Sequence, residues 1–202
     1  NSDSHITSLL NLANLYHRTS QFKKALNIYT KVFNIYKSGK NSNKLEFAKM
    51  LISYGDFQRL VGMYDESKES FSVSKDLLIE LELTNDVDRA NLLYAESKLE
   101  KDMGNYKIAE TKILSSLKII SEIYGKHHTK YANILFTQSQ ILRTLSRYEE
   151  AENVSNECLL IYKSQKGKNS ISYYIALSNL ASQFSAQGNY EKALSLKTNA
   201  LN

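Results

Sequence analysis

Proline is absent from the 202 residues, and only seven glycines are present. These two residues most often end helices and form tight turns. A chain that is poor in both and lacks strand-like alternation is therefore predicted to be almost entirely helical. The one cysteine, Cys158, excludes an internal disulfide framework and fits a reducing compartment. No apolar run approaches about 18 residues, so the sequence predicts no transmembrane helix.

Charge of one sign is not concentrated anywhere in the chain. The 26 lysines and arginines outnumber the 21 acidic residues, giving a net charge of +5, and no block of five or more basic residues occurs. Nucleic acid is therefore not an expected partner, because basic arms that bind it usually contain such blocks. The sequence begins without methionine and without a signal-peptide pattern, so we expect a fragment of a longer protein.

The main feature that is present is a short phrase repeated five times at one spacing. It reads SQFKKALNI at 20–28, GMYDESKES at 62–70, GNYKIAETK at 104–112, SRYEEAENV at 146–154 and GNYEKALSL at 188–196. Each copy has Gly or Ser first, an aromatic residue third, and Ala or Ser sixth. A fixed period of about 20–50 residues is typical of solenoid proteins, in which each repeat covers the apolar face of its neighbour.

Each repeat contains two stretches with helical periodicity. In the first repeat, Leu9, Leu12, Ala13 and Tyr16 share one helical face, and a second such pattern starts at Ala25. The predicted helices cover about 5–18, 21–38, 45–60, 63–82, 86–102, 105–123, 129–144, 147–164, 170–186 and 189–201. We expect one array over 1–202, with repeats at about 5–43, 44–84, 85–127, 128–168 and 169–202.

Signals for the ends of helices lie between these stretches. The expected stops are Gly39-Lys40, Gly125-Lys126 and Gly167-Lys168, and the expected N-caps are Ser42, Asn85, Thr129 and Ser170. A column of mostly small residues, which includes Cys158, is predicted to be buried between helices. We therefore expect Cys158 to be an inert packing residue.

The repeat resembles the tetratricopeptide repeat. The 42-residue spacing, the Asn-Leu-Ala triplets at 11–13 and 179–181, and GKHHTKYA at 125–132 are most similar to the kinesin light chain subclass. This resemblance implies an all-α fold, an α-solenoid of five helix-turn-helix repeats coiled into a right-handed superhelix with the first helices on its concave face. Repeat two departs most from the family pattern, with Gly55 in its first helix and Ser67 in the alanine column, and repeat three has Ser97 where a small apolar residue is usual. Both repeats are expected to be looser.

The resemblance places a partner-binding groove on the first helices. The candidate residues are Asn11, Asn14, Lys49, Arg59, Tyr94, Lys98, Lys101, Phe136, Gln140, Arg143 and Asn179. Cations beside aromatic rings favour a peptide or helix with acidic and bulky apolar residues. The alternatives are that the cations are only solvated, that Tyr94 and Phe136 belong to the core, and that Asn11 and Asn179 are packing amides.

The sequence does not match the patterns of a carboxylate clamp, a metal site or a phosphate-binding loop. The carboxylate clamp of chaperone-binding tetratricopeptide domains would need a Lys where Leu10 stands and an Asn where Ser53 stands. The histidines do not form a metal-ligand pattern, and His127-His128 is expected to be an exposed loop pair. Gly167-Lys168 lacks the upstream glycine and the preceding strand of a phosphate-binding loop. No metal, cofactor or catalytic residue is therefore expected.

The predicted function is a non-catalytic scaffold or adaptor that binds a peptide or helix of another protein. The kinesin light chain resemblance implies a cytoplasmic protein in a motor, cytoskeletal or ciliary assembly. The alternative is a docking, oligomerisation or peptide-sensing region of a larger enzyme or signalling protein.

Overall fold

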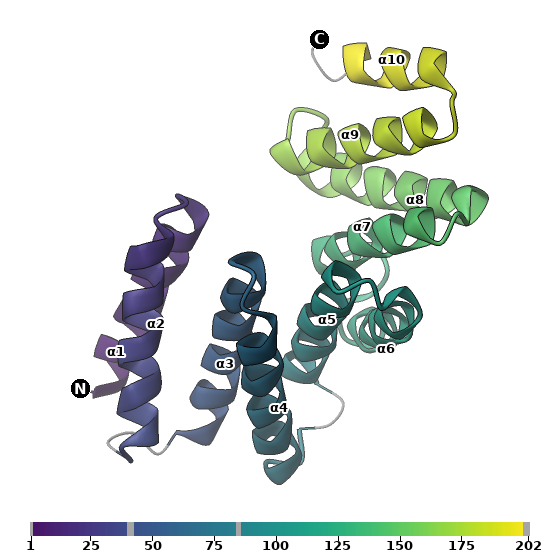
Figure 1. The fold of residues 1–202 in the computed structure, drawn as a ribbon. Coiled ribbons are helices and arrows are strands. Elements are labelled where there is room, and N and C mark those ends of the chain that lie inside the picture. The colour runs from purple at the N-terminus through teal and green to yellow at the C-terminus, as the bar shows by residue number, and fades with distance from the viewer. Residues whose placement is uncertain (1, 40–42, 84–85, 200–202) are drawn as a thin grey trace. The chain divides into compact units, whose positions relative to one another are not determined.

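The computed structural model describes residues 2–39, 43–83 and 86–199, and all the regular elements of these residues are α-helices (Figure 1). They are α1 (Ser2–Arg18), α2 (Phe22–Lys37), α3 (Lys44–Leu60), α4 (Tyr64–Glu80), α5 (Val87–Asp102), α6 (Tyr106–Tyr124), α7 (Thr129–Thr144), α8 (Tyr148–Lys166), α9 (Ile171–Ala186) and α10 (Tyr190–Asn199). Every predicted helix is present, and the predicted all-α fold is confirmed. The chain divides into two compact units, Asn1–Thr84 with α1–α4 and Asn85–Asn202 with α5–α10.

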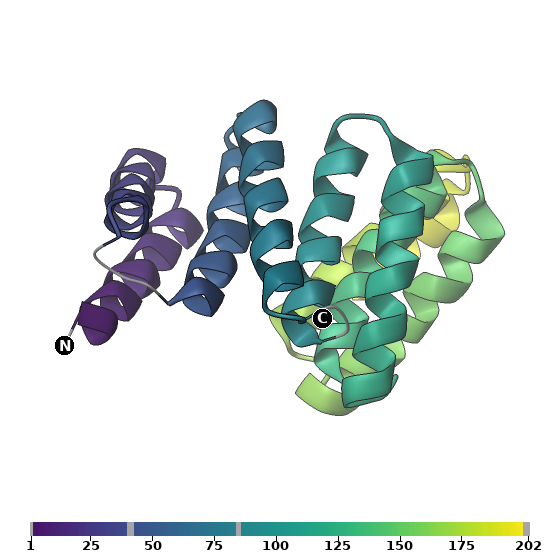
Figure 2. The same cartoon turned by 90° about the horizontal axis from the view of Figure 1, so that it is seen from below.

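The helices are arranged as consecutive pairs, each made of a first and a second helix of one repeat (Figures 1 and 2). Inside the second unit, α6 packs against α7 and α8 against α9, so each pair covers the next one. The first helices α5, α7 and α9 also contact each other directly in this order. Stacking of this kind is the architecture of an α-solenoid.

The two helices of a pair meet at small residues. On the second helix the buried column is Ala25, Ser67, Ala109, Ala151 and Ala193, and on the first helix it is Ala13, Gly55, Ser97, Ser139 and Ala181. Small side chains allow the two helix backbones to approach closely, and the aromatic or aliphatic neighbours then fill the remaining space.

A third column adds hydrogen bonds between the two helices of a pair. Its side chains donate to a carbonyl on the first helix: Ser74 Oγ to Ala48 O at 2.9 Å, Ser116 Oγ to Ala90 O at 2.8 Å, and Cys158 Sγ to Ala132 O at 3.3 Å. Each donor is 1% exposed or less. The buried hydroxyl and thiol groups are satisfied in this way, so these small residues do more than fill space. Ala200, the last member of this column, lies outside the described residues.

The turn inside each repeat requires one residue with positive φ. This residue is Ser20, Gly62, Gly104, Ser146 or Gly188, with φ between 57° and 84°. The left-handed conformation is accessible to glycine at little cost and disfavoured for serine, so the serine-containing turns of repeats one and four carry some strain. Glycine occupies this position in three of the five turns.

The predicted N-cap Thr129 is wrong. Thr129 is the first residue of α7, and His128 is the cap, with its Nδ1 accepting a hydrogen bond from Lys130 N at 3.0 Å. The His128 ring also stacks on Tyr124, with 4.7 Å between ring centroids. His128 is therefore partly buried and structural, while the neighbouring His127 is exposed as expected.

Of the other predicted helix ends, some are confirmed and some lie outside the described residues. Ser170 is the N-cap of α9 as expected, and its Oγ accepts from Tyr173 N at 3.3 Å. Ser42, Asn85 and Lys40 lie outside the described residues; the caps of α3 and α5 are Asn43 and Asp86. Gly125 and Gly167 end α6 and α8 with φ near +78° and ψ near +160°, a region that only glycine adopts readily.

The core of the first unit is aromatic. Tyr29 stacks on Tyr54 with ring centroids 5.3 Å apart and contacts Phe57 at 5.4 Å. The Tyr29 hydroxyl donates to Asn14 Oδ1 at 2.7 Å, which satisfies it inside the core. Burial, with a smaller contribution from the charge of Asp56, raises the pKa of Tyr29 to about 12. The second unit has an aliphatic core, in which Ile113, Ile120 and Leu135 are almost fully buried.

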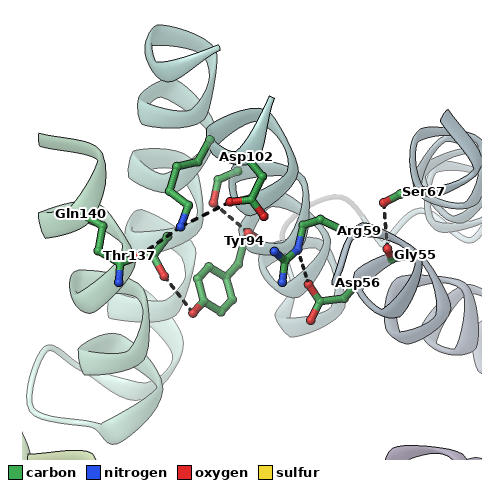
Figure 3. A network of polar contacts seen from close by, with 10 residues as sticks. Gly55, Asp56, Arg59, Ser67, Tyr94, Asp102, Thr137 and Gln140 are labelled. Atoms are coloured by element: carbon green, nitrogen blue, oxygen red, sulfur yellow. Dashed lines mark hydrogen bonds and ion pairs between the residues drawn. The ribbon is translucent and has the colours of Figure 1, made fainter. Parts of the chain in front are cut away.

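Repeat two has an unusually close helix contact at Gly55. A Cβ atom at this position would lie 2.5 Å from Phe71 Cε1 and 2.8 Å from Phe71 Cδ1. Ser67 Oγ donates to Gly55 O at 2.8 Å in the same contact (Figure 3). The two departures from the family pattern, Gly55 and Ser67, therefore belong to one arrangement that admits the Phe71 ring.

We expect Gly55→Ala to destabilise the protein, although alanine is the better helix former by about 1 kcal/mol. The new methyl group would overlap the Phe71 ring, and overpacking of this kind costs about 1–3 kcal/mol. Urea unfolding followed by circular dichroism measures the change. The double variant Gly55→Ala/Phe71→Leu should recover part of the loss. A gain in stability for Gly55→Ala alone would contradict the close contact.

We expect Cys158 to resist thiol reagents in the folded protein. Burial is the main cause that raises the pKa of its thiol to about 12, so the reactive thiolate is scarce at neutral pH. Ellman's reagent should react with one thiol only after denaturant is added. Cys158→Ser should retain the bond to Ala132, as Ser74 and Ser116 do at their own positions, and should fold. Rapid labelling under native conditions would exclude the buried position.

Candidate functional site

Seven of the candidate residues lie on the first helices of the second unit. Tyr94, Lys98 and Lys101 are on α5, Phe136, Gln140 and Arg143 are on α7, and Asn179 is on α9. All seven are half-buried. They are therefore neither core residues nor freely solvated ones, which is the degree of exposure expected of side chains that line an interaction surface.

Tyr94 connects α5 to α7. Its hydroxyl lies 3.1 Å from Thr137 Oγ1 (Figure 3) and also 3.2 Å from Asn133 O. Its ring packs against the aliphatic core of the unit. Lys98 Nζ lies 4.8 Å from the ring centroid, within the range of a cation–π interaction. The sequence left open whether Tyr94 is a groove residue or a core residue. Its ring contacts the core and is also partly exposed, so both descriptions apply.

Lys101 and Gln140 form a second connection between the same two helices. Lys101 Nζ donates to Gln140 Oε1 at 3.1 Å and lies 3.5 Å from Asp102 Oδ1 (Figure 3). The side chain of Lys101 is 24% exposed. Its ammonium group is thus held in place by two neighbours, with one carboxylate partly compensating its charge.

Phe136 and Arg143 complete this face on α7. Phe136 packs against the core but keeps part of its ring exposed. Arg143 lies in the last turn of α7, where a cation is favoured by the partial negative charge of the helix end. A cation and an aromatic ring therefore lie on α7 as well as on α5.

Asn179 has a packing contact. Its Nδ2 donates to Ser139 Oγ at 2.9 Å, which connects α9 to α7. This is the alternative role considered for Asn179. Thr137 and Ser139, which the sequence did not single out for such roles, are both buried and both accept or share these inter-helix hydrogen bonds. Their signal in the sequence is a polar residue at a position where the helical periodicity predicts an apolar one.

The four remaining candidates lie in the first unit. Asn11 and Asn14 are both exposed, and Asn14 Oδ1 accepts a hydrogen bond from the Tyr29 hydroxyl. Lys49 Nζ lies 3.2 Å from Glu46 Oε1, and Arg59 Nε lies 2.9 Å from Asp56 Oδ1 with only 10% of its side chain exposed (Figure 3). Asn14 and Arg59 therefore have structural partners within this unit.

Neither a metal-ligand cluster nor a membrane-spanning helix occurs among the described residues. Among residues 2–39, 43–83 and 86–199, no group of three or more His, Cys, Asp or Glu side chains is placed to hold a metal ion. In the same ranges, no helix has both the length and the apolar character needed to span a bilayer. On α5 and α7, half-buried rings and cations lie on the same helices.

Two segments match the tetratricopeptide repeat at the level of sequence. They are residues 8–40 and residues 88–164, which together make up more than half of the chain. No protein of curated function is similar enough in sequence to be recognised as a relative.

Solved structures resemble the whole chain in fold. The Rap protein complexed with Competence and Sporulation Factor has a TM-score of 0.82 at 16% identity, covering 96% of this chain and 52% of that chain. BtubC (BKLC) from P. vanneervenii has a TM-score of 0.79 at 15% identity, covering 96% and 78%. A kinesin light chain-like protein of Podosopora anserina with nearly identical TPR-like repeats has a TM-score of 0.72 at 14% identity, covering 98% and 93%.

The sequence matches, the columns of small buried residues and the consecutive helix pairs all lead to one assignment. This chain belongs to the tetratricopeptide repeat family, and its fold is an α-solenoid of five such repeats.

Proposed function

We propose that this chain is a non-catalytic scaffold that binds a peptide or helix of a partner protein on the face formed by α5, α7 and α9. The observation that carries the proposal is the set of half-buried rings and cations on α5 and α7. Tetratricopeptide folds are generally protein-interaction scaffolds, and the Rap structure contains a bound factor.

The arrangement of Tyr94 supports this proposal. Its ring is fixed by the hydroxyl contacts with α7, so little conformational entropy is lost when a partner packs on it. Aromatic residues held in this way are typical of the residues that dominate binding energy at protein interfaces. The exposed part of the Tyr94 ring is therefore a suitable contact for a bulky apolar side chain.

The cations favour a partner with acidic residues. Lys98, Lys101 and Arg143 are each half-buried, so their interaction with a carboxylate is less screened by water than that of a fully exposed lysine. An acidic residue near an aromatic or aliphatic one would contact both features of this face. In the first unit, Asn11 and Lys49 are the first-helix residues that we propose for further contact.

The biological setting is proposed from similarity of fold. Kinesin light chain-like repeats favour an adaptor in a motor, cytoskeletal or ciliary assembly of the cytoplasm. The Rap structure, of which this chain covers about half, favours a second candidate: a peptide-sensing, docking or oligomerisation region of a larger enzyme or signalling protein. A partner located on cytoskeletal filaments would distinguish the first candidate from the second.

Charge reversal on this face should abolish binding of acidic peptides. We expect Lys98→Glu/Lys101→Glu/Arg143→Glu to weaken binding of acidic-aromatic peptides from an array by more than about tenfold, because attraction becomes repulsion. Fluorescence anisotropy at low and high salt measures the loss, and wild-type affinity should fall as salt rises.

The matched control reverses three exposed lysines elsewhere in the same unit: Lys107→Glu/Lys118→Glu/Lys126→Glu. The two variants have the same net charge, so a difference between them reports the position of the charges. Equal affinities for both variants would show that the face on α5 and α7 does not bind the peptide.

A further inference from the structure

The first unit contains a cavity between α2, α3 and α4, away from the candidate residues of that unit. Its volume is about 320 Å³. The apolar part of its lining comes from Phe33 on α2, Leu51 and Tyr54 on α3, and Val73 on α4. Thr30 and Asn34 border it and also border a shallower depression of about 590 Å³ along α2. The other lining residues are polar or charged, so the cavity combines an apolar patch with hydrogen-bonding and charged groups, as many binding sites do.

A buried amide lines this cavity. Gln58 is 4% exposed, and its Oε1 accepts a hydrogen bond from Ser70 Oγ at 2.7 Å. This bond fixes the orientation of the amide. The Nε2 group, which has no partner among the described residues, is left to donate toward the cavity that Gln58 lines. This donor is not among the fully buried unpaired atoms, so solvent reaches it, and a ligand carbonyl would accept the hydrogen bond in place of water.

This polar pair is specific to repeat two. The residue pairs at the positions of Gln58 and Ser70 in the other repeats are Tyr16 and Ile28, Glu100 and Lys112, Leu142 and Val154, and Phe184 and Leu196. Three of these four pairs are composed of aromatic and aliphatic residues, so the helix packing itself does not require an amide and a hydroxyl. We attribute the polar pair to binding.

The charged border of the cavity is mainly acidic. Glu66 and Glu69 lie one turn apart on α4, and neither has an ion-pair partner in the described part of the chain. Lys37 is the cation that lines the cavity, and its Nζ lies over the Phe33 ring at 5.3 Å. Two carboxylates therefore face one lysine, on a protein whose net charge is +5.

We propose that this cavity docks a segment of a partner protein that presents a bulky apolar side chain next to an arginine or lysine. The apolar side chain would contact Phe33 and Val73, the cation would pair with Glu66 and Glu69, and a backbone carbonyl would accept from Gln58. This preference is opposite in charge to that of the face on α5 and α7. The two sites therefore bind different segments.

The second unit provides an internal comparison. A cavity of about 340 Å³ lies there at the equivalent positions three repeats later, bordered by Asn156, Leu159, Leu160, Lys163 and Tyr173. Phe184 and Lys192 replace Gln58 and Glu66 in that repeat, and Lys192 Nζ lies 3.9 Å from the Phe184 ring centroid. The buried amide and the acidic border are thus absent from its lining. We expect no preference for basic peptides there.

The test uses short acetylated and amidated peptides as probes and protein NMR as the readout. The basic set combines Leu, Ile or Phe with neighbouring Arg or Lys; the matched set has Glu in place of each basic residue. The basic peptides should shift the side-chain amide of Gln58 and backbone amides of α2 and α4 saturably at millimolar concentration. Glu66→Gln/Glu69→Gln should weaken this binding about tenfold, and Gln58→Leu should weaken it as well.

Two controls keep the result interpretable. Glu122→Gln/Glu157→Gln removes two exposed carboxylates from second helices of the other unit and should leave binding unchanged. Lys98→Glu/Lys101→Glu/Arg143→Glu should also leave it unchanged, which separates this site from the proposed function. The absence of saturable shifts, an equal response to acidic peptides, or undiminished binding by Glu66→Gln/Glu69→Gln would overturn the proposal.

Discussion

The close approach of two helices inside each repeat is the contact on which the rest of the structure depends. It occurs where small residues of one helix face small residues of the other, as Ala25 faces the region of Ala13 in repeat one. Only with this spacing can the larger side chains on both sides meet and exclude water. In the second unit, each pair formed in this way then covers the apolar face of the next pair.

Polar groups inside these contacts are compatible with burial because each has a carbonyl partner. Ser74, Ser116 and Cys158 each donate to the first helix of their own repeat across the same sequence separation of 26 residues. The hydrogen bonds are possible only when the two helices have the correct axial register, so they add specificity to a contact that is otherwise apolar. The contact at Gly55 also depends on the register of the two helices. Because Gly55 has no side chain, the Phe71 ring of the second helix fills the space beside it.

The two proposed binding sites differ because the repeats share a backbone but not their surface chemistry. On α5 and α7, cations lie beside partly exposed rings, as Lys98 does over Tyr94. Between α2 and α4, carboxylates border a cavity that combines apolar side chains with one buried amide, Gln58. Repetition of one packing unit thus leaves exposed positions free to vary, and a scaffold with two unlike docking sites needs no change of fold.

The sequence by itself determined the helices and the turns between them. These features depend on local periodicity and on residues such as Gly104, whose conformational freedom is an intrinsic property. Only the tertiary structure decided which distant groups meet: the hydroxyl of Tyr94 with Thr137, and Ser70 with Gln58. The tertiary structure also shows that His128, whose ring stacks on Tyr124, is the N-cap of α7 in place of Thr129. Periodicity assigns a side chain to a helix face, but its partner depends on rotamers and on the axial offset between helices, which no single stretch of sequence contains.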